Sequence, residues 1–245
     1  MIVKTNAIVL KTVDYSESSV IATLFTREKG KTAVIAKGAR RPKSKFAAFL
    51  VPGQLIEVIY YYKQSRSVQT LSDISYSKKL NSLRVEINKM ALMMSTLELT
   101  SQLLHENEVN KPLYNFIETF LEWADKQKEI PKLLFPYIQL RLAEHTGVGL
   151  QIAEELAQEG EGFINISSGT ISNDATDEHS ARLSPMQFAF VKKSLHSANT
   201  SVLRIVMDGE EIKNLINILD NYFIYHIEGV KPRKSDKIFE QLLKK

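Results

Sequence analysis

The first 75 residues alternate short apolar runs with polar turns, and this pattern predicts a small β-rich domain. The runs are rich in β-branched and aromatic residues, as strands are, and glycine, proline or polar groups separate them. We expect five strands, at residues 7–13, 20–26, 32–36, 55–62 and 68–71. The third and fourth are separated by residues 37–53, which is too long for a hairpin loop. Three strands, an insertion and two further strands are the order of an OB-fold barrel.

From about Lys79 onward the apolar residues recur in alternating steps of three and four, which is the period of an amphipathic helix. The pattern predicts a long helix from Leu80 to Leu104, followed by helices over 113–124, 132–145, 185–196 and 212–223. Pro112 suits a first helical turn, where a missing N–H does no harm, and Gly147 suits a left-handed helix stop.

Residues 151–181 differ from their surroundings, with seven acidic residues, three glycines and no Lys or Arg. Their short alternating runs, at 163–166 and 170–172, predict a small hairpin insertion. We therefore expect an α+β chain with an OB-fold domain over residues 1–78. A helical domain would follow over residues 79–245, and the acidic insertion would lie within it.

Composition excludes several classes of function. The chain has no cysteine, which rules out disulfides, thiol catalysis and cysteine-ligated metals. No run of about 18 apolar residues and no signal-peptide pattern is present, so we expect a cytoplasmic protein. The motifs of P-loop, dinucleotide-binding, zinc-protease and serine-hydrolase enzymes are missing, and the five histidines have no ligand spacing. We expect no enzymatic activity, no cofactor and no metal.

Charge is unevenly distributed along the chain. Residues 1–80 carry 14 Lys and Arg against 5 Asp and Glu, whereas the remainder is net acidic, and the whole chain is +4. Such asymmetry indicates a polyanion-binding surface on the basic part, with nucleic acid as the first candidate. The strongest concentration lies in two neighbouring segments, and it comprises Arg27, Lys29, Lys31, Lys37, Arg40, Arg41, Lys43 and Lys45.

On an OB barrel these two segments could border one groove that follows a phosphate backbone. A solvated basic loop without a partner is the alternative. Tyr60 and Tyr62 alternate with Tyr61 in the fourth strand, so one set faces outward and could stack on bases. We take Tyr60 and Tyr62 as the candidates, and packing inside the barrel is the alternative for whichever set turns inward.

Several of these stretches resemble a known family. The sequences IVLK at 8–11, DYSES at 14–18, LFTREKGK at 24–31, AKGARR at 36–41 and KS at 43–44 are similar to the N-terminal domain of the bacterial RecO recombination mediators. Weaker similarity continues at 97–99, 147–149 and 231–235. The resemblance implies an OB-fold followed by helices, binding of single- and double-stranded DNA, and location at the nucleoid. It also implies annealing of strands covered by single-stranded-DNA-binding protein, and help in loading RecA together with RecR.

Two further expectations come from this resemblance. Many relatives carry a four-cysteine zinc site in the insertion, which this chain lacks. The family also binds the acidic, Phe-ended tail of single-stranded-DNA-binding protein, and a basic rim beside an apolar notch could hold such a tail. The candidates for that rim are Lys126, Lys128, Lys132, Tyr137 and Arg141, although lysines that simply cover the core are the alternative.

Two other classes of function remain open at this point. A protein scaffold could use the basic face to dock an acidic partner tail, and it would have little affinity for DNA. A phosphoryl-transfer enzyme would need clustered carboxylates for magnesium. The basic domain offers only scattered acids, and we therefore expect a non-enzymatic mediator of DNA repair and recombination.

Overall fold

The computed structural model describes residues 1–153, 160–196, 200–233 and 235. The chain divides into two compact units, Met1–Lys128 and Glu129–Lys245. None of the helices in the described ranges is long and apolar enough to cross a membrane.

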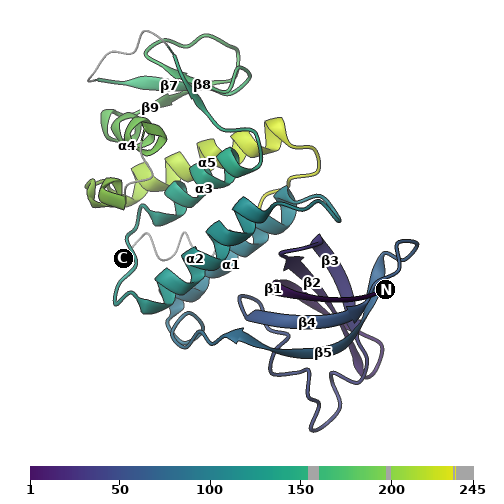
Figure 1. The fold of residues 1–245 in the computed structure, drawn as a ribbon. Coiled ribbons are helices and arrows are strands. Elements are labelled where there is room, and N and C mark those ends of the chain that lie inside the picture. Colours follow the sequence, from purple (N-terminus) through teal and green to yellow (C-terminus); the bar gives the residue numbers. More distant parts are fainter. Residues whose placement is uncertain (154–159, 197–199, 234, 236–245) are drawn as a thin grey trace. The chain divides into compact units, whose positions relative to one another are not determined.

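The first unit begins with a closed five-stranded barrel, drawn in purple and blue in Figure 1. Its strands are β1 (Ile2–Tyr15), β2 (Ser19–Thr26), β3 (Gly30–Ala36), β4 (Leu55–Tyr61) and β5 (Val68–Lys78). They pair in the order β1-β2-β3-β5-β4, and β4 closes the barrel against β1. Neighbours are antiparallel except β3 and β5, which are parallel. The arrangement confirms the predicted OB-fold.

Two strands are longer than their apolar runs indicated. The register of β1 against β2 shifts between Val9 and Lys11, and such a bulge bends a strand so that it can pair with two neighbours. In β5 the residues after Leu71 alternate between the core and the outer surface, so that Ile74 is buried while Asp73 and Ser75 are exposed. A half-exposed strand of this kind carries no continuous apolar run.

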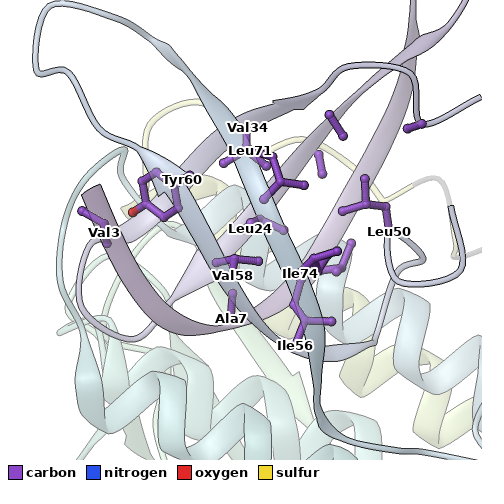
Figure 2. Close-up of a cluster of buried hydrophobic side chains, with 14 residues drawn as sticks. Val3, Ala7, Leu24, Val34, Leu50, Ile56, Val58, Tyr60, Leu71 and Ile74 are labelled. Atoms are coloured by element: carbon purple, nitrogen blue, oxygen red, sulfur yellow. The ribbon is translucent and has the colours of Figure 1, made fainter. Parts of the chain in front are cut away.

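Alternate residues of every strand fill the barrel, as Figure 2 shows for the central part of the core. In β4 the inward-facing residues are Ile56, Val58 and Tyr60, all completely buried. Residues 46–50, between β3 and β4, form turns, and Leu50 closes one end of the core with Phe46 and Phe49 packed beside it.

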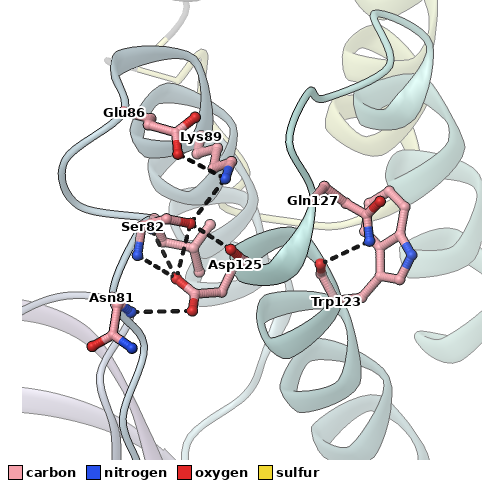
Figure 3. A network of polar contacts seen from close by, with 8 residues as sticks. Asn81, Ser82, Glu86, Lys89, Trp123, Asp125 and Gln127 are labelled. Carbon is pink, nitrogen blue, oxygen red and sulfur yellow. Dashed lines mark hydrogen bonds and ion pairs between the residues drawn. The ribbon is translucent and has the colours of Figure 1, made fainter.

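Helices α1 (Ile87–Leu103) and α2 (Lys111–Lys126) complete the first unit. The predicted helix start at Leu80 is wrong, because residues 79–86 form an irregular segment bound to the end of α2. The Asp125 carboxylate accepts N–H bonds from Asn81 (3.1 Å), Ser82 (2.7 Å) and Leu83 (3.0 Å), as drawn in Figure 3. Burial acts to raise the pKa of Asp125, but these N–H donors outweigh it and hold the pKa below the usual value of an aspartate.

The ammonium of Lys89 lies behind this segment and is almost fully buried. It donates to the Ser82 hydroxyl at 2.9 Å and pairs with Glu86 at 2.9 Å (Figure 3). A buried charge is tolerated only when it is paired and hydrogen-bonded, so this network fixes the path of the chain between β5 and α1.

The second unit contains α3 (Leu134–His145), α4 (Pro185–His196) and α5 (Gly209–His226), close to their predicted positions, with a 3-10 turn at Thr200–Arg204. Gly147 has φ of 81° directly after α3, as expected for a left-handed stop. The insertion forms a four-stranded sheet instead of a hairpin alone. Its strands are β6 (Gln151–Ile152), β7 (Gly162–Asn165), β8 (Thr170–Ser172) and β9 (Ser180–Leu183), in the order β6-β8-β7-β9.

Candidate nucleic-acid interface

The two basic segments lie at opposite ends of β3. The basic hairpin, residues 27–31, joins β2 to β3, and the basic connection, residues 37–45, leaves the far end of β3 after Ala36. Six residue steps along a strand separate Lys31 from Lys37, which corresponds to about 20 Å. The two segments therefore do not meet at one tip of the barrel. That they border one groove along the barrel stays a prediction.

The basic hairpin is bound to the segment between α1 and α2. Asn107 N–H donates to the Lys31 carbonyl at 3.0 Å, and Lys31 forms a parallel bridge with Glu106. The Lys31 ammonium donates to the Ser101 carbonyl at 3.0 Å, and Lys111 pairs with Glu28 at 2.9 Å. The pairing of Lys31 with Glu106 and Asn107 extends the sheet beside the start of β3. β5 does not pair with β3 there, because the pairing of these two strands begins at Ala33.

Burial lowers the pKa of Lys31, and the nearby Glu106 opposes that effect. The half-buried Lys31 side chain places its ammonium on a carbonyl within the fold. Lys29 also has a local partner, since its ammonium lies 5.3 Å from the centre of the Tyr62 ring. Only Arg27 of the three hairpin cations is fully exposed.

The basic connection has a different environment. Lys37, Arg40, Arg41, Lys43 and Lys45 are all exposed. Consecutive turns hold the backbone, with Arg41 N–H donating to Gly38 and Ser44 N–H donating to Arg41. Lys43 adopts a φ of 62°, which places it in the left-handed region at the tip.

Two of these five cations help to fasten the connection to the barrel. The Arg40 guanidinium pairs with Asp14 at 3.4 Å and donates to the Ser16 carbonyl at 3.0 Å. The Arg40 backbone N–H donates to the Ser18 carbonyl. Lys45 pairs with Asp73 on β5 at 2.9 Å, and that hydrogen bond lowers the pKa of Asp73.

Lys37, Arg41 and Lys43 form no ion pair within the part of the chain that the structure describes. The residues after the basic connection are anchored by Phe49, whose ring centre lies 4.5 Å from that of Tyr76. The Tyr76 hydroxyl also donates to the Ala48 carbonyl. A tethered loop thus presents three cations to solvent.

The three consecutive tyrosines separate as alternation requires, but the outward one is Tyr61. Tyr60 is completely buried among the core residues of Figure 2, and burial raises its pKa. It offers no ring face to a base, which corrects its assignment as a stacking residue. Tyr62 is half-buried against the core under the Lys29 ammonium, whereas Tyr61 is 52% exposed. Alternation identified the two sets, and only the barrel register decides which set faces outward.

The five residues predicted to hold a partner tail divide between the units. Lys126 and Lys128 are exposed at the end of the first unit, and Lys132 is exposed in the second. Tyr137 and Arg141 are buried on α3, with the guanidinium 5.3 Å from the ring centre. Arg141 also pairs with Glu144 at 2.8 Å and donates to the Ser194 carbonyl on α4. These contacts give Arg141 a structural role within the second unit.

Comparison with known proteins assigns the chain to a family. The family model described as "Recombination protein O N terminal" matches residues 1–79, and "Recombination protein O C terminal" matches residues 84–236. The chain belongs to the recombination protein O family. It is 30% identical to the DNA repair protein RecO of Salinibacter ruber, over 98% of this chain and 94% of that protein. The protein of the same name from Chlorobium limicola is 28% identical over the whole of both chains. This family membership supports a role in DNA repair.

The insertion of this family member does not fit the four-cysteine zinc site that the resemblance implies, because the chain has no cysteine. In the described residues no group of three His, Asp or Glu side chains could hold a metal. Glu154, Glu155 and Glu159 of the acidic insertion lie outside those residues, as does the basic stretch 236–245.

Hydrogen bonds centred on Asn165 join three parts of the insertion. The buried Asn165 amide donates to the Ser172 hydroxyl at 2.7 Å, and its oxygen accepts from Thr176 N–H and from Ser180. The neighbouring carboxylate of Asp177 accepts N–H bonds from Ser167 and His179. Polar side chains thus connect β7, β8 and β9 in this chain.

Proposed function

We propose that this chain is a non-enzymatic recombination mediator that binds single- and double-stranded DNA through the basic connection and anneals complementary strands. The observation that carries the proposal is the set of three exposed cations, Lys37, Arg41 and Lys43, on a loop fastened to the barrel. Lysine and arginine bind phosphates by displacing condensed counterions, which gives affinity without dependence on sequence. The DNA repair role of the family supports DNA as the polyanion.

Annealing follows from the same electrostatics. Two complementary strands repel each other through their phosphates, and a protein that neutralises both backbones lowers the barrier to pairing. Base edges must stay free for this, and side chains that hold only phosphate leave them free. No nucleotide hydrolysis is required for the step.

The partners in the proposal are those implied by the family resemblance. Single-stranded-DNA-binding protein would be engaged through its acidic tail, RecR would act together with this chain, and RecA would be loaded indirectly. Lys126, Lys128 and Lys132 are the exposed cations proposed for the acidic tail, without the buried Arg141.

Charge reversal at the basic connection tests the proposal. We expect the full-length triple variant Lys37→Glu, Arg41→Glu, Lys43→Glu to lose single-stranded DNA affinity by about 100-fold at low salt, because three phosphate contacts become repulsive. The slope of log affinity against log salt should become shallower by about 2, since each single-strand phosphate contributes about 0.7. Fluorescence anisotropy across a salt series measures both quantities.

The matched control is Lys126→Glu, Lys128→Glu, Lys132→Glu, which changes the net charge equally. It should keep DNA affinity within a few-fold and lose affinity for the acidic tail peptide. Unchanged DNA binding by the first variant would show that the connection is a solvated loop. Failure of the unaltered protein to bind DNA would instead favour the scaffold that docks an acidic tail.

A further inference from the structure

A row of outward-facing side chains crosses all five strands of the barrel and shifts along them, from Val13 near the end of β1 to Ile2 at its start. Val13 pairs with Ile21, Ile21 with Ile35, and Ile35 with Thr70. Thr70 pairs in turn with Tyr61, and Tyr61 with Ile2. We call these six residues the apolar belt. Because paired residues share a face of the sheet, the belt is continuous from β1 through β2, β3, β5 and β4 and back to β1.

The belt lies on the outside of the barrel. The residues next to it along the strands, including Val34, Tyr60 and Leu71, point into the core and are buried. Ile2 is 64% exposed and Val13 is 51% exposed, while Ile21, Ile35 and Thr70 are half-buried. The solvent face of a sheet normally carries polar residues, so the exposed apolar side chains of Ile2, Val13 and Tyr61 call for an occupant.

Cations flank the belt along its length. Lys11 lies two residues before Val13, Lys37 two residues after Ile35, and Lys63 two residues after Tyr61. All three lysines are exposed, and none forms an ion pair within residues 1–153, 160–196, 200–233 and 235. An apolar strip with cations near it matches a strand that carries flat apolar groups on an anionic backbone.

The turn that carries Lys63 is also rigidly held. The buried Gln69 side chain accepts from Lys63 N–H at 2.8 Å and donates to the carbonyls of Lys63 and Arg66. With these inward polar groups satisfied, Lys63 and Arg66 face solvent. Such preorganisation reduces the loss of entropy when a ligand binds.

We propose that the apolar belt is the surface that contacts the bases of single-stranded DNA, with Tyr61 as the stacking residue and the flanking lysines on the phosphates. The inference rests on the proposed DNA-binding function and adds the distinction between unpaired and paired strands. From Val13 through β2, β3 and β5 to Tyr61 the belt crosses four strand spacings, about 19 Å measured around the barrel.

The test compares three probes of equal length on the full chain: oligothymidylate, an abasic oligomer and a duplex. The unaltered protein should prefer oligothymidylate to the abasic oligomer. Tyr61→Ala should reduce oligothymidylate affinity about tenfold and leave the abasic and duplex affinities unchanged, because stacking on one aromatic ring is lost. Tyr61→Phe should restore the preference. Tyr225→Ala, at a tyrosine of similar exposure in the second unit, is the matched control.

Each other outcome has a defined meaning. Equal affinity for oligothymidylate and the abasic oligomer, with no effect of Tyr61→Ala, would overturn the inference while the phosphate-binding function stands. Equal losses on all three probes would also overturn it, because the substitution would then act through the barrel itself. No affinity of the unaltered protein for any probe would identify a failure of the proposed function.

Discussion

Gly30 and Gly38 lie at opposite ends of β3 with nearly the same backbone conformation, φ of 63° and 73°. A Cβ added at Gly30 would lie 1.9 Å from the Glu108 carbonyl oxygen, whereas at Gly38 the nearest atom is Cδ of the Arg41 side chain at 3.6 Å. The basic hairpin is therefore in close contact with the chain between α1 and α2, and the basic connection faces solvent. Two basic segments of one sequence thus produce a docking element at one end of β3 and a solvent-facing cationic loop at the other.

The largest difference in the free energy of unfolding should appear when each of the two glycines is replaced separately by alanine. Gly38→Ala should lower the free energy of unfolding by about 1 kcal/mol, the cost of a positive φ. Gly30→Ala carries the same strain and a collision with backbone, and we expect a loss of about 3 kcal/mol or more. Urea unfolding followed by the fluorescence of Trp123, the single tryptophan, reports on the first unit. Equal losses would show that the hairpin is not docked in solution.

Replacing one lysine from each segment should separate stability from binding. Lys31→Ala removes a half-buried side chain and its hydrogen bond to Ser101, so we expect about 1–2 kcal/mol less stability. Its affinity for single-stranded DNA should stay within twofold. Lys37→Ala should change stability by less than about 0.5 kcal/mol and lower the affinity severalfold.

Urea unfolding and fluorescence anisotropy on the same preparations measure both quantities. A loss of affinity in Lys31→Ala without a loss of stability would place the hairpin on the DNA surface. That result would remove the distinction between the two ends of β3.

The sequence could predict the barrel because each strand has its own alternating apolar run, a local property. It could not show that Glu106 and Asn107, far downstream, pair with Lys31, since long-range pairing leaves no local pattern. The start of α1 was missed for the same reason, because Asp125 on α2 binds residues 81–83. The apolar period alone cannot show that a carboxylate elsewhere in the chain binds the N–H groups of the expected first turn.

The three consecutive tyrosines show how much the alternation of side chains along a strand can predict. It separates Tyr61 from Tyr60 and Tyr62, but the inward set depends on register with β1 and β5, and Tyr61 was overlooked as a candidate. The pairing of Ile2 with Tyr61, which places both on the outside, exists only in the closed barrel. Arg141 shows the opposite error, because a cation beside an aromatic residue on a helix is also what a buried arginine with a structural role produces.

The smallest expected effect is a difference between the pKa values of two carboxyl groups, one near each of the two basic segments. Hydrogen bonds from Lys111 and Lys45 lower the pKa values of Glu28 and Asp73, respectively, below those of ordinary carboxyl groups. A lowered carboxyl pKa contributes stability above the ordinary pKa, and that stability is lost as the pH falls through the lowered value. Both groups are exposed, so the contribution is small, but carboxyl NMR resolves each pKa separately.

Oligothymidylate should change one of these two pKa values. If the basic connection binds phosphate, Lys45 is drawn from Asp73, and the pKa of Asp73 should rise toward its ordinary value because a cation is replaced by nearby anions. The pKa of Glu28 should not move, since Lys111 and the docked hairpin stay in place. Lys45→Gln should raise the pKa of Asp73 without DNA and remove its response. A matching shift of Glu28 would show that DNA reaches the hairpin end of β3 as well.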